Sequence, residues 1–347
     1  MMWQVATMIM LFATLTGCAS RPTCATSDTN LVRCSEYIKV SDAKLYLLTR
    51  GSDRNAPILL WLHGGPGGPE RPLFRYFNGV LENNFVVAYL DQRGAGRSFD
   101  PDADPHRLTV SQHLADLDTV VDHLRRTFHK NQIILVGHSW GGMLGLLYTK
   151  QHPEKITAFV GVAPLIASLK AQQAEYDFVS TEAAKRNEES VTERLQEIGP
   201  PPYQTHDSLL ALESLADQYG VVFHTKPCKV CVVVKGMFAG LASFGDLMSI
   251  HRGVQTSLNE MTPELLKLDL NSTVSNTEVP VFFLLGRHDR HVDSKIAADY
   301  FEALHAPVKR LIWFENSAHN VPFEESELFN ETVINTLQSI GIQRIRP

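Results

Sequence analysis

Residues 133–148 read IILVGHSWGGMLGLLY, and this stretch decides the fold. The apolar run at 133–136 predicts a buried strand, and the sequence MLGLLY at 143–148 predicts the helix that follows it. Between them, GHSWG at 137–141 fits the pattern G-x-S-x-G, in which glycines leave room for a cramped turn from strand to helix. The stretch therefore predicts a strand, a tight turn that exposes Ser139, and a helix.

Apolar runs elsewhere in the chain predict further buried strands of the same sheet. With the first run, they lie at 57–63, 85–90, 132–136, 158–162 and 279–285. Helical patterns at 111–128 and 141–151 alternate with these strands. Because such alternation builds parallel sheets covered by helices, we predict an α/β protein with a mostly parallel, doubly wound sheet.

The alternation stops at residues 164–278, where we predict an inserted helical cap. A capping hydroxyl before a proline predicts that one cap helix begins at Thr262. The other predicted parts are a signal peptide at 1–17, a linker at 18–33, and the α/β core in two pieces at 34–163 and 279–347.

The chain has 347 residues, of which 44% are hydrophobic and 20% charged, as in a globular protein with a large core. Its net charge of −6 argues against nucleic acid as the main partner. Residues 164–277 hold 14 acidic and 9 basic side chains, so most of the negative charge lies in the insert. These acids are either solvated helix faces or groups that bind a positively charged substrate.

The first twenty residues, MMWQVATMIMLFATLTGCAS, are too short to span a bilayer comfortably and end in small residues, as secretory signals do. Residues 15–18, LTGC, resemble the lipobox of bacterial lipoproteins. We therefore expect cleavage before Cys18, lipid on Cys18, and an exported protein anchored to a bacterial membrane, in the periplasm or at the cell surface. Because no Lys or Arg precedes the apolar run, a plain secretory signal or an uncleaved anchor is the alternative.

Four cysteines remain if Cys18 carries lipid, and an even number in an oxidising compartment predicts disulfides. Three pairings exist, and Cys24 with Cys34 and Cys228 with Cys231 close the shortest loops. The second pair could instead be half a zinc site or a redox pair, but no second ligand cluster or thioredoxin-like context accompanies it. We expect no metal.

The serine at the predicted turn needs a general base held by a carboxylate, because a serine hydroxyl is a weak nucleophile at neutral pH. Asp289 follows the strand at 279–285, and His319 follows the apolar stretch at 311–314. Both lie at strand ends, where this architecture places its site. The order Ser139, Asp289, His319 therefore predicts the catalytic residues.

Other acidic and histidine side chains lie close to Asp289 in the sequence and are alternatives for the acid and the base. Asp293 is the rival acid, and we expect His288 and His291 to shape the acid loop rather than act as the base.

Two glycine-rich loops follow the first two of these strands. HGGPG at 63–67 can supply bare backbone amides, so we predict that the amides of Gly65 and Trp140 bind the oxyanion. In the second loop, DQRGAGRS at 91–98, we expect Asp91 and Arg93 to be structural. The spacing of nucleotide-binding loops is missing there, and we expect no cofactor.

These motifs together resemble the α/β-hydrolases and, within them, the proline iminopeptidase group of serine peptidases. The matching segments are HGGPGG at 63–68, DQRGAGRS at 91–98, GHSWGG at 137–142, GRHD at 286–289 and SAH at 317–319. The resemblance implies an α/β-hydrolase fold, a triad of Ser139, Asp289 and His319, the oxyanion amides named above, and a helical cap over the pocket.

The chain departs from that group around the nucleophile and in the cap. His138 and Gly142 replace a glycine and a serine of the group's usual Gly-Gly-Ser-Trp-Gly-Ser. Group members bind the substrate's amino terminus through acidic cap residues. The candidates here are Glu175, Asp177, Glu182, Asp207, Glu213, Asp217 and Asp246.

Three functions remain open. The first is an aminopeptidase that releases an N-terminal residue, often proline, through an acyl-enzyme. The second is an esterase, amidase or lactonase with the same triad, whose apolar run at 232–244 lines a pocket for a small acyl group. The third is a lipoprotein that keeps the fold as a binding module.

Overall fold

A computed structural model describes residues 23–24, 30–225 and 244–342 of the chain, with the side chains of 30–225 and 249–342. Several predicted features lie outside these residues, namely the signal peptide at 1–17, Cys18, Cys228, Cys231 and residues 232–243 of the apolar run. In the described part of the chain, no helix is both long and apolar enough to cross a membrane.

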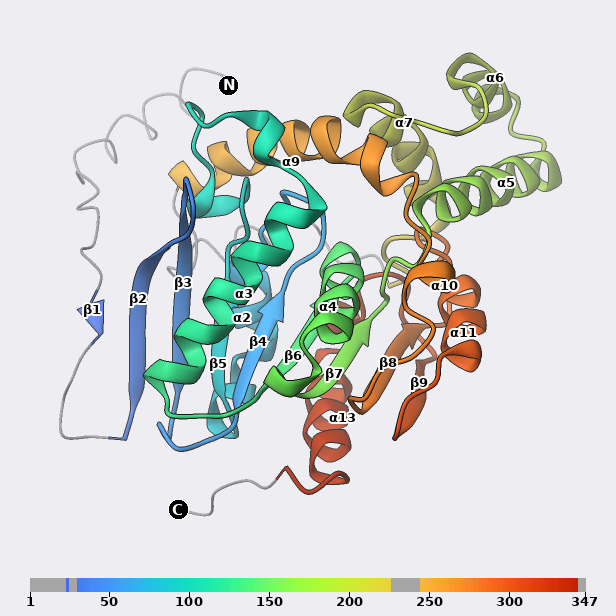
Figure 1. The fold of residues 1–347 in the computed structure, drawn as a ribbon. Helices are drawn as coiled ribbons and strands as arrows, with labels where there is room; N and C mark the ends of the chain where they lie inside the picture. The colour runs from blue at the N-terminus through green and yellow to red at the C-terminus, as the bar shows by residue number, and fades with distance from the viewer. Residues whose placement is uncertain (1–22, 25–29, 226–243, 343–347) are drawn as a thin grey trace, which may run out of the picture.

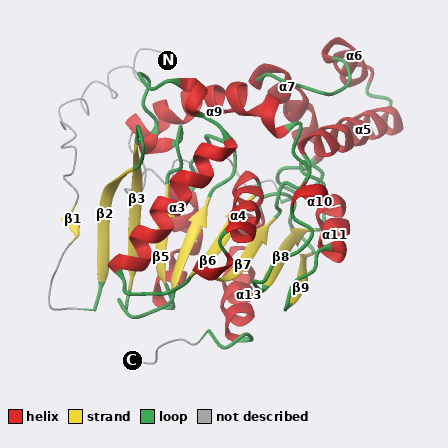
Figure 2. Ribbon diagram, viewed as in Figure 1, coloured by secondary structure: helices red, strands yellow, loops and turns green. Residues whose placement is uncertain are grey.

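A nine-stranded sheet forms the centre of the molecule (Figures 1 and 2), in the order β1-β2-β3-β5-β4-β6-β7-β8-β9. The six strands β4 to β9 are parallel, and β1 to β3 extend the sheet as antiparallel strands. The strands are β1 Thr23–Cys24, β2 Val32–Lys39, β3 Lys44–Gly51, β4 Ile58–Leu62, β5 Val86–Leu90, β6 Ile133–His138, β7 Ile156–Val162, β8 Val281–Gly286 and β9 Lys309–Phe314.

Helices cover both faces of the sheet because alternate residues of the central strands are apolar on both sides. One face packs against α3 (Val110–Thr127), α4 (Trp140–Gln151) and α11 (Ser294–Ala303). The other packs against α2 (Arg71–Asn78), α12 (Val321–Glu324) and α13 (Ser326–Gln338). The predicted mostly parallel, doubly wound sheet is confirmed.

The helical insert lies between β7 and β8, over the edge of the sheet toward which the parallel strands point (Figure 1). Its helices are α5 Ser168–Arg186, α6 Glu189–Ile198, α7 His206–Ala216, α9 Phe244–Leu265 and α10 Leu270–Thr273. Side chains of α5, α6 and α7 form an apolar cluster of their own, separate from the two clusters of the core. The insert therefore forms a cap over the edge where the strands end.

The sheet begins before residue 34, so the predicted linker at 18–33 is wrong in part. Thr23–Cys24 form β1, and Val32 and Arg33 are the first residues of β2. β2 mixes buried and exposed residues, so it contains too few consecutive apolar residues to be recognised from the sequence as a buried strand. The pairing of β1 with β2 places Cys24 opposite Cys34, while the disulfide between them stays a prediction.

The predicted helix start at Thr262 is also wrong. The helix α9 runs without interruption from Phe244 to Leu265 and contains Pro263 in its last turn. A proline removes one backbone donor, and at this position it costs the helix a single hydrogen bond shortly before its end. The pair Thr262-Pro263 therefore marks the end of a helix here and not its beginning.

Candidate active site

Ser139 occupies a strained turn between β6 and α4. Its backbone has φ 53° and ψ −118°, a conformation that non-glycine residues rarely adopt. The turn is fixed on both sides, because the Ser139 amide donates to Val162 O at 3.0 Å and the Leu165 amide donates to Ser139 O at 3.0 Å. The side chain is therefore held at one place above the sheet.

The glycines around Ser139 are required by close backbone contacts. A Cβ on Gly137 would lie 2.2 Å from Gly141 O, and one on Gly141 would lie 2.2 Å from Leu62 O. A Cβ on Gly142 would lie 2.6 Å from Cβ of Pro164. Strands β4 and β6 and helix α4 approach so closely at this turn that the glycine hydrogen fits and a side chain does not, as the G-x-S-x-G pattern predicted.

The predicted acid and base lie together. His319 Nδ1 lies 3.0 Å from Asp289 Oδ2, and both side chains are buried. Asp289 Oδ1 accepts hydrogen bonds from the amides of His291 and Val292. Burial alone would raise the pKa of Asp289, but the charge of His319 and its hydrogen bond lower it, so the carboxylate is ionised. Burial lowers the pKa of His319 against the opposing effect of Asp289.

The alternatives near the acid loop have other roles. Asp293 caps α11, because its side chain accepts from the amide of Lys295 at 2.8 Å. His288 stacks on His224 with ring centroids 3.5 Å apart, and its Nε2 lies 3.1 Å from Glu315 O. Asp289 is therefore the acid that reaches His319.

One glutamine, which the sequence analysis did not single out, connects the loops around Ser139. The side-chain amide of Gln92 donates to His63 O at 2.8 Å and accepts from the Trp140 indole at 3.0 Å, while its backbone amide donates to His63 Nε2 at 3.0 Å. Burial lowers the pKa of His63, so this ring is neutral and its Nδ1 donates to Gly64 O. Gln92 thus fixes the loop 63–67 against the start of α4.

The loop 63–67 lies directly against Ser139. A Cβ on Gly64 would lie 3.2 Å from Cβ of Ser139. Gly65 has φ 111°, and Trp140 is the first residue of α4, so its amide has no acceptor within the helix. Gly65 in its loop and Trp140 at the start of α4 therefore lie on either side of Ser139, and the binding of an oxyanion by their amides stays a prediction.

A histidine–glutamate pair lies beside this site. His138 Nδ1 lies 2.6 Å from Glu70 Oε1, and His138 Nε2 lies 3.0 Å from the backbone oxygen of His319. The rings of His138 and His319 are 4.7 Å apart between centroids. Since His138 immediately precedes Ser139, this contact brings the base loop to the nucleophile turn.

One of the candidate cap acids reaches the acid loop. Glu175 of α5 is buried, and its Oε1 lies 3.0 Å from Nδ1 of His291. Burial alone would lower the pKa of His291, but the charge and hydrogen bond of Glu175 raise it to about 10. Glu213 of α7 acts electrostatically on both members of this pair. The ring of His291 in turn lies 4.9 Å from that of His319.

Three other cap acids, Asp177, Glu182 and Asp207, have other partners or face solvent. Asp177 accepts from Gln173 on the exposed side of α5, and Glu182 pairs with Lys185 and Arg186. Asp207 lies beside His206 with 86% of its side chain exposed. Asp217 begins the short 3₁₀ turn after α7, and the side chain of Asp246 lies outside the described residues.

Asp91 and Arg93 make the contacts expected of structural residues. Asp91 is fully buried and binds Arg71 through both oxygens. Arg93 binds Asp116 through two nitrogens and also pairs with Asp42. These ion pairs hold the loop 91–98 in place.

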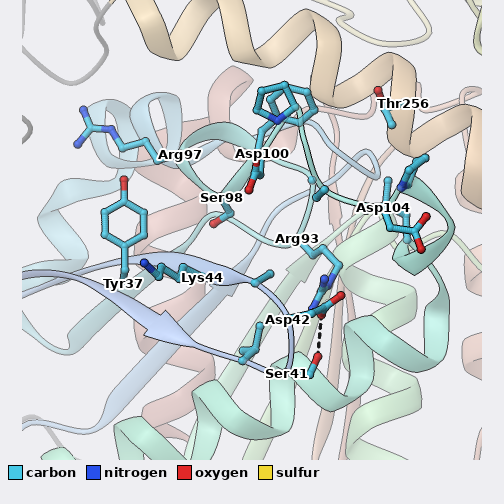
Figure 3. A pocket seen from close by; sticks show the side chains of 18 of the residues that line it. Tyr37, Ser41, Asp42, Lys44, Arg93, Arg97, Ser98, Asp100, Asp104 and Thr256 are labelled. Atoms are coloured by element: carbon cyan, nitrogen blue, oxygen red, sulfur yellow. Dashed lines mark hydrogen bonds and ion pairs between the residues drawn. The ribbon is translucent and has the colours of Figure 1, made fainter.

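A cavity of about 640 Å³ lies away from the triad (Figure 3). It extends from Tyr37 and Arg97 at one end to Asp104 and Thr256 at the other, and none of the predicted catalytic residues lines it. Its walls carry both charges and include Arg93, which already pairs with Asp42 and Asp116. Among the described residues, no group of three or more histidines, cysteines and acids could hold a metal ion.

Comparisons with known proteins identify the family of the chain. The model of the alpha/beta hydrolase fold family matches residues 57–326. A Bacillus subtilis protein called "Probable aminopeptidase YbaC" is 28% identical over 297 residues, which cover 85% of this chain and 93% of that relative. A "Proline iminopeptidase" of Saccharolobus solfataricus is 25% identical over 295 residues, 84% of this chain and 86% of that relative.

Solved structures show the same fold. The proline iminopeptidase of Mycobacterium smegmatis superposes with a TM-score of 0.65 at 19% identity, covering 88% of this chain and 98% of that one. The structure of VinJ superposes with a TM-score of 0.66 at 20% identity, with the same coverage of both chains.

Proposed function

Because this chain belongs to the α/β-hydrolase fold family and is a hydrolase, we propose that it is a serine aminopeptidase that releases an N-terminal residue, with proline preferred, from peptides. The observation that carries the serine mechanism is the buried contact of His319 with Asp289 at 3.0 Å, and the one that favours a peptidase is the buried carboxyl group of Glu175 at the acid loop.

In the proposed mechanism, Ser139 attacks the carbonyl carbon of the first residue while His319 takes the proton of its hydroxyl. Asp289 holds His319 in the tautomer that carries hydrogen on Nδ1, so that Nε2 is free to accept. The amides of Gly65 and Trp140 stabilise the oxyanion. His319 then protonates the leaving amine, and water releases the acyl-enzyme through the same base.

The charges around the acid loop support recognition of a free amino group. Glu175, Glu213 and Asp289 all act electrostatically on His291. Burial raises the pKa of Glu175, as do Glu213 and Asp289, against the opposing effect of His291. A substrate ammonium beside Glu175 would favour its ionised form. Because Glu175 is buried, its interaction with an ammonium is weakly screened by solvent.

The names of the relatives also support the peptidase over the esterase. The Bacillus subtilis relative is called an aminopeptidase and the Saccharolobus solfataricus relative a proline iminopeptidase, and both match along most of their length.

The decisive experiment compares prolyl and alanyl chromogenic amides, with free and blocked amino termini, against a short-chain ester. We expect cleavage of the free amides and none of the blocked ones. Ester turnover with no amide cleavage would instead identify an esterase and remove the peptidase proposal.

The role of the cap acid is tested with the variant Glu175→Gln. We expect kcat/KM for free-amine substrates to fall by about ten- to a hundredfold, the effect of losing a hydrogen bond to a charged group. Asp177→Asn, two residues along the same helix and on its exposed side, is the matched control and should leave kcat/KM unchanged. Equal effects of the two variants would exclude Glu175 from amine binding.

We propose in addition that the chain is exported and held at a bacterial membrane through lipid on Cys18. The support is the sequence LTGC at residues 15–18 after an apolar stretch.

A further inference from the structure

His138 joins three segments of the candidate site. It is the last residue of β6, directly before Ser139. Its Nδ1 contacts Glu70, which lies just before α2 after the loop 63–67, and its Nε2 contacts the backbone oxygen of His319. One buried side chain therefore connects the nucleophile turn, the oxyanion loop and the base loop.

Both partners of the His138 ring are acceptors. A backbone carbonyl and an ionised carboxylate both accept hydrogen bonds, and neither can donate one. The contacts of 2.6 Å to Glu70 and 3.0 Å to His319 O are both hydrogen bonds when each ring nitrogen carries hydrogen, which is the imidazolium form. Burial alone would lower the pKa of His138, but the charge and hydrogen bond of Glu70 outweigh it and raise that pKa.

We propose that His138 is a positioning residue of the proposed serine mechanism: as an imidazolium bound to Glu70, it fixes the base loop through His319 O and disfavours protonation of the His319 ring. The inference rests on His319 being the base proposed above.

The charges around His319 determine the size and sign of this effect. Asp289 favours the protonated form of the His319 ring, whereas His138 and His291 oppose it. Farther out, Glu175 pairs with His291. On the other side of the base loop, Glu324 of α12 accepts from the amide of Ala318 at 2.8 Å. Because the His138 ring centroid is only 4.7 Å from that of His319, its charge acts at close range and keeps the base neutral at lower pH.

The test uses the rate at which a fluorophosphonate probe labels Ser139, measured between about pH 4 and 9. This rate depends on the neutral form of His319 and requires no knowledge of the natural substrate. At acidic pH the labelling rate falls because His319 becomes protonated, and we call this fall the acid limb. In His138→Gln the neutral side chain removes the positive charge, so the midpoint of the acid limb should move upward by about one pH unit. Below that limb, labelling should be about tenfold slower than in the wild type.

Glu70→Gln provides a second, independent variant. Without the carboxylate, His138 loses its proton, and the acid limb should move in the same direction. The double variant should move it no further than His138→Gln alone, because both changes remove the same charge.

A matched control is His123→Gln, which breaks a similar histidine–glutamate pair between α3 and β2, with His123 Nε2 3.1 Å from Glu36. It should leave the acid limb in place. If Ser139 is labelled in both His138→Gln and Glu70→Gln with the acid limb at the same pH as in the wild type, the inference is overturned. The serine mechanism is not affected by that result. A wild-type protein that is not labelled at any pH would overturn the serine mechanism and the inference with it.

Discussion

At the scale of single residues, backbone geometry fixes the positions of the side chains that we propose to be catalytic. Ser139 has φ 53° and is held by two backbone hydrogen bonds, so the backbone atoms that carry its side chain have a fixed position. Asp289 receives two amide hydrogen bonds in addition to its contact with His319, which fixes the acid in the same way. The site is therefore preorganised, as electrostatic stabilisation of a transition state requires.

The first prediction concerns the nucleophile. Ser139→Ala should lower turnover by on the order of a million-fold, because the loss of a triad serine removes the covalent route. Alanine keeps Cβ and the strained backbone, so the thermal unfolding temperature should stay close to that of the wild type. Turnover of the chromogenic amides and a melting curve measure both effects. Undiminished turnover in the folded variant would contradict the serine mechanism.

The second prediction separates the two candidate acids. Asp289→Asn should lower kcat about ten-thousandfold, because an asparagine would favour the wrong tautomer of His319. Asp293→Ala should instead leave kcat unchanged and cost about 1 kcal/mol of stability through loss of the α11 cap. Steady-state kinetics and chemical denaturation of the two variants distinguish these roles. The reverse pattern would make Asp293 the catalytic acid.

The sequence alone predicted Ser139, Asp289 and His319 as the triad because each lies at a predicted strand end in the required order, and the structure brings Asp289 and His319 into contact. It did not identify Gln92 or Glu70, whose roles depend on contacts across the sheet edge with residues 29 and 68 positions away. Gln92 could have been noticed as the one neutral residue among the charges that open DQRGAGRS. The choice of Glu175 among seven cap acids required the packing of α5 over the acid loop.

At the scale of elements, the central strands were predictable because parallel strands covered on both faces are continuous apolar runs. β4 and β5 are fully buried along their length. β2, the second strand from the edge of the sheet, mixes buried and exposed residues, and no short sequence pattern separates such a strand from a loop. The end of α9 was read as a beginning for a similar reason, since a proline is tolerated in either terminal turn.

Close packing of a cap helix on the glycine loops leads to the third prediction. A Cβ on Gly253 of α9 would lie 2.5 Å from Gly94 O, and one on Gly67 would lie 2.5 Å from Gly253 O. Gly253→Ala should therefore push α9 away from both loops. It should cost about 1–3 kcal/mol of stability, the range for overpacking, and should lower kcat because the oxyanion loop moves with it.

Denaturant titration and steady-state kinetics measure this effect. The matched control is Gly79→Ala, where an added Cβ meets no atom within 4 Å and the backbone φ is −60°. A Gly253→Ala protein as stable as the Gly79→Ala protein would mean that α9 does not pack tightly on the loops.

At the scale of the whole molecule, the fourth prediction concerns location. Cys18→Ser should release the protein from the membrane fraction, because the residue that carries the proposed lipid is lost. Fractionation of cells followed by detection of the protein in soluble and membrane pools measures the outcome, with Cys34→Ser as the control that should stay anchored. Membrane association unchanged in Cys18→Ser would contradict lipid attachment at this cysteine.

The cap is inserted between two strands that are hydrogen-bonded neighbours, since Val162 of β7 pairs with Leu284 of β8. Most buried apolar side chains of α5 to α7 belong to a cluster of their own, while Ala171 of α5 belongs to the core of the sheet. A descendant gene can exchange or remodel these helices while every strand keeps its partners. Substrate choice can therefore change without a change in the residues that break the bond. His291 links the two, because it lies in the acid loop and contacts Glu175 of the cap.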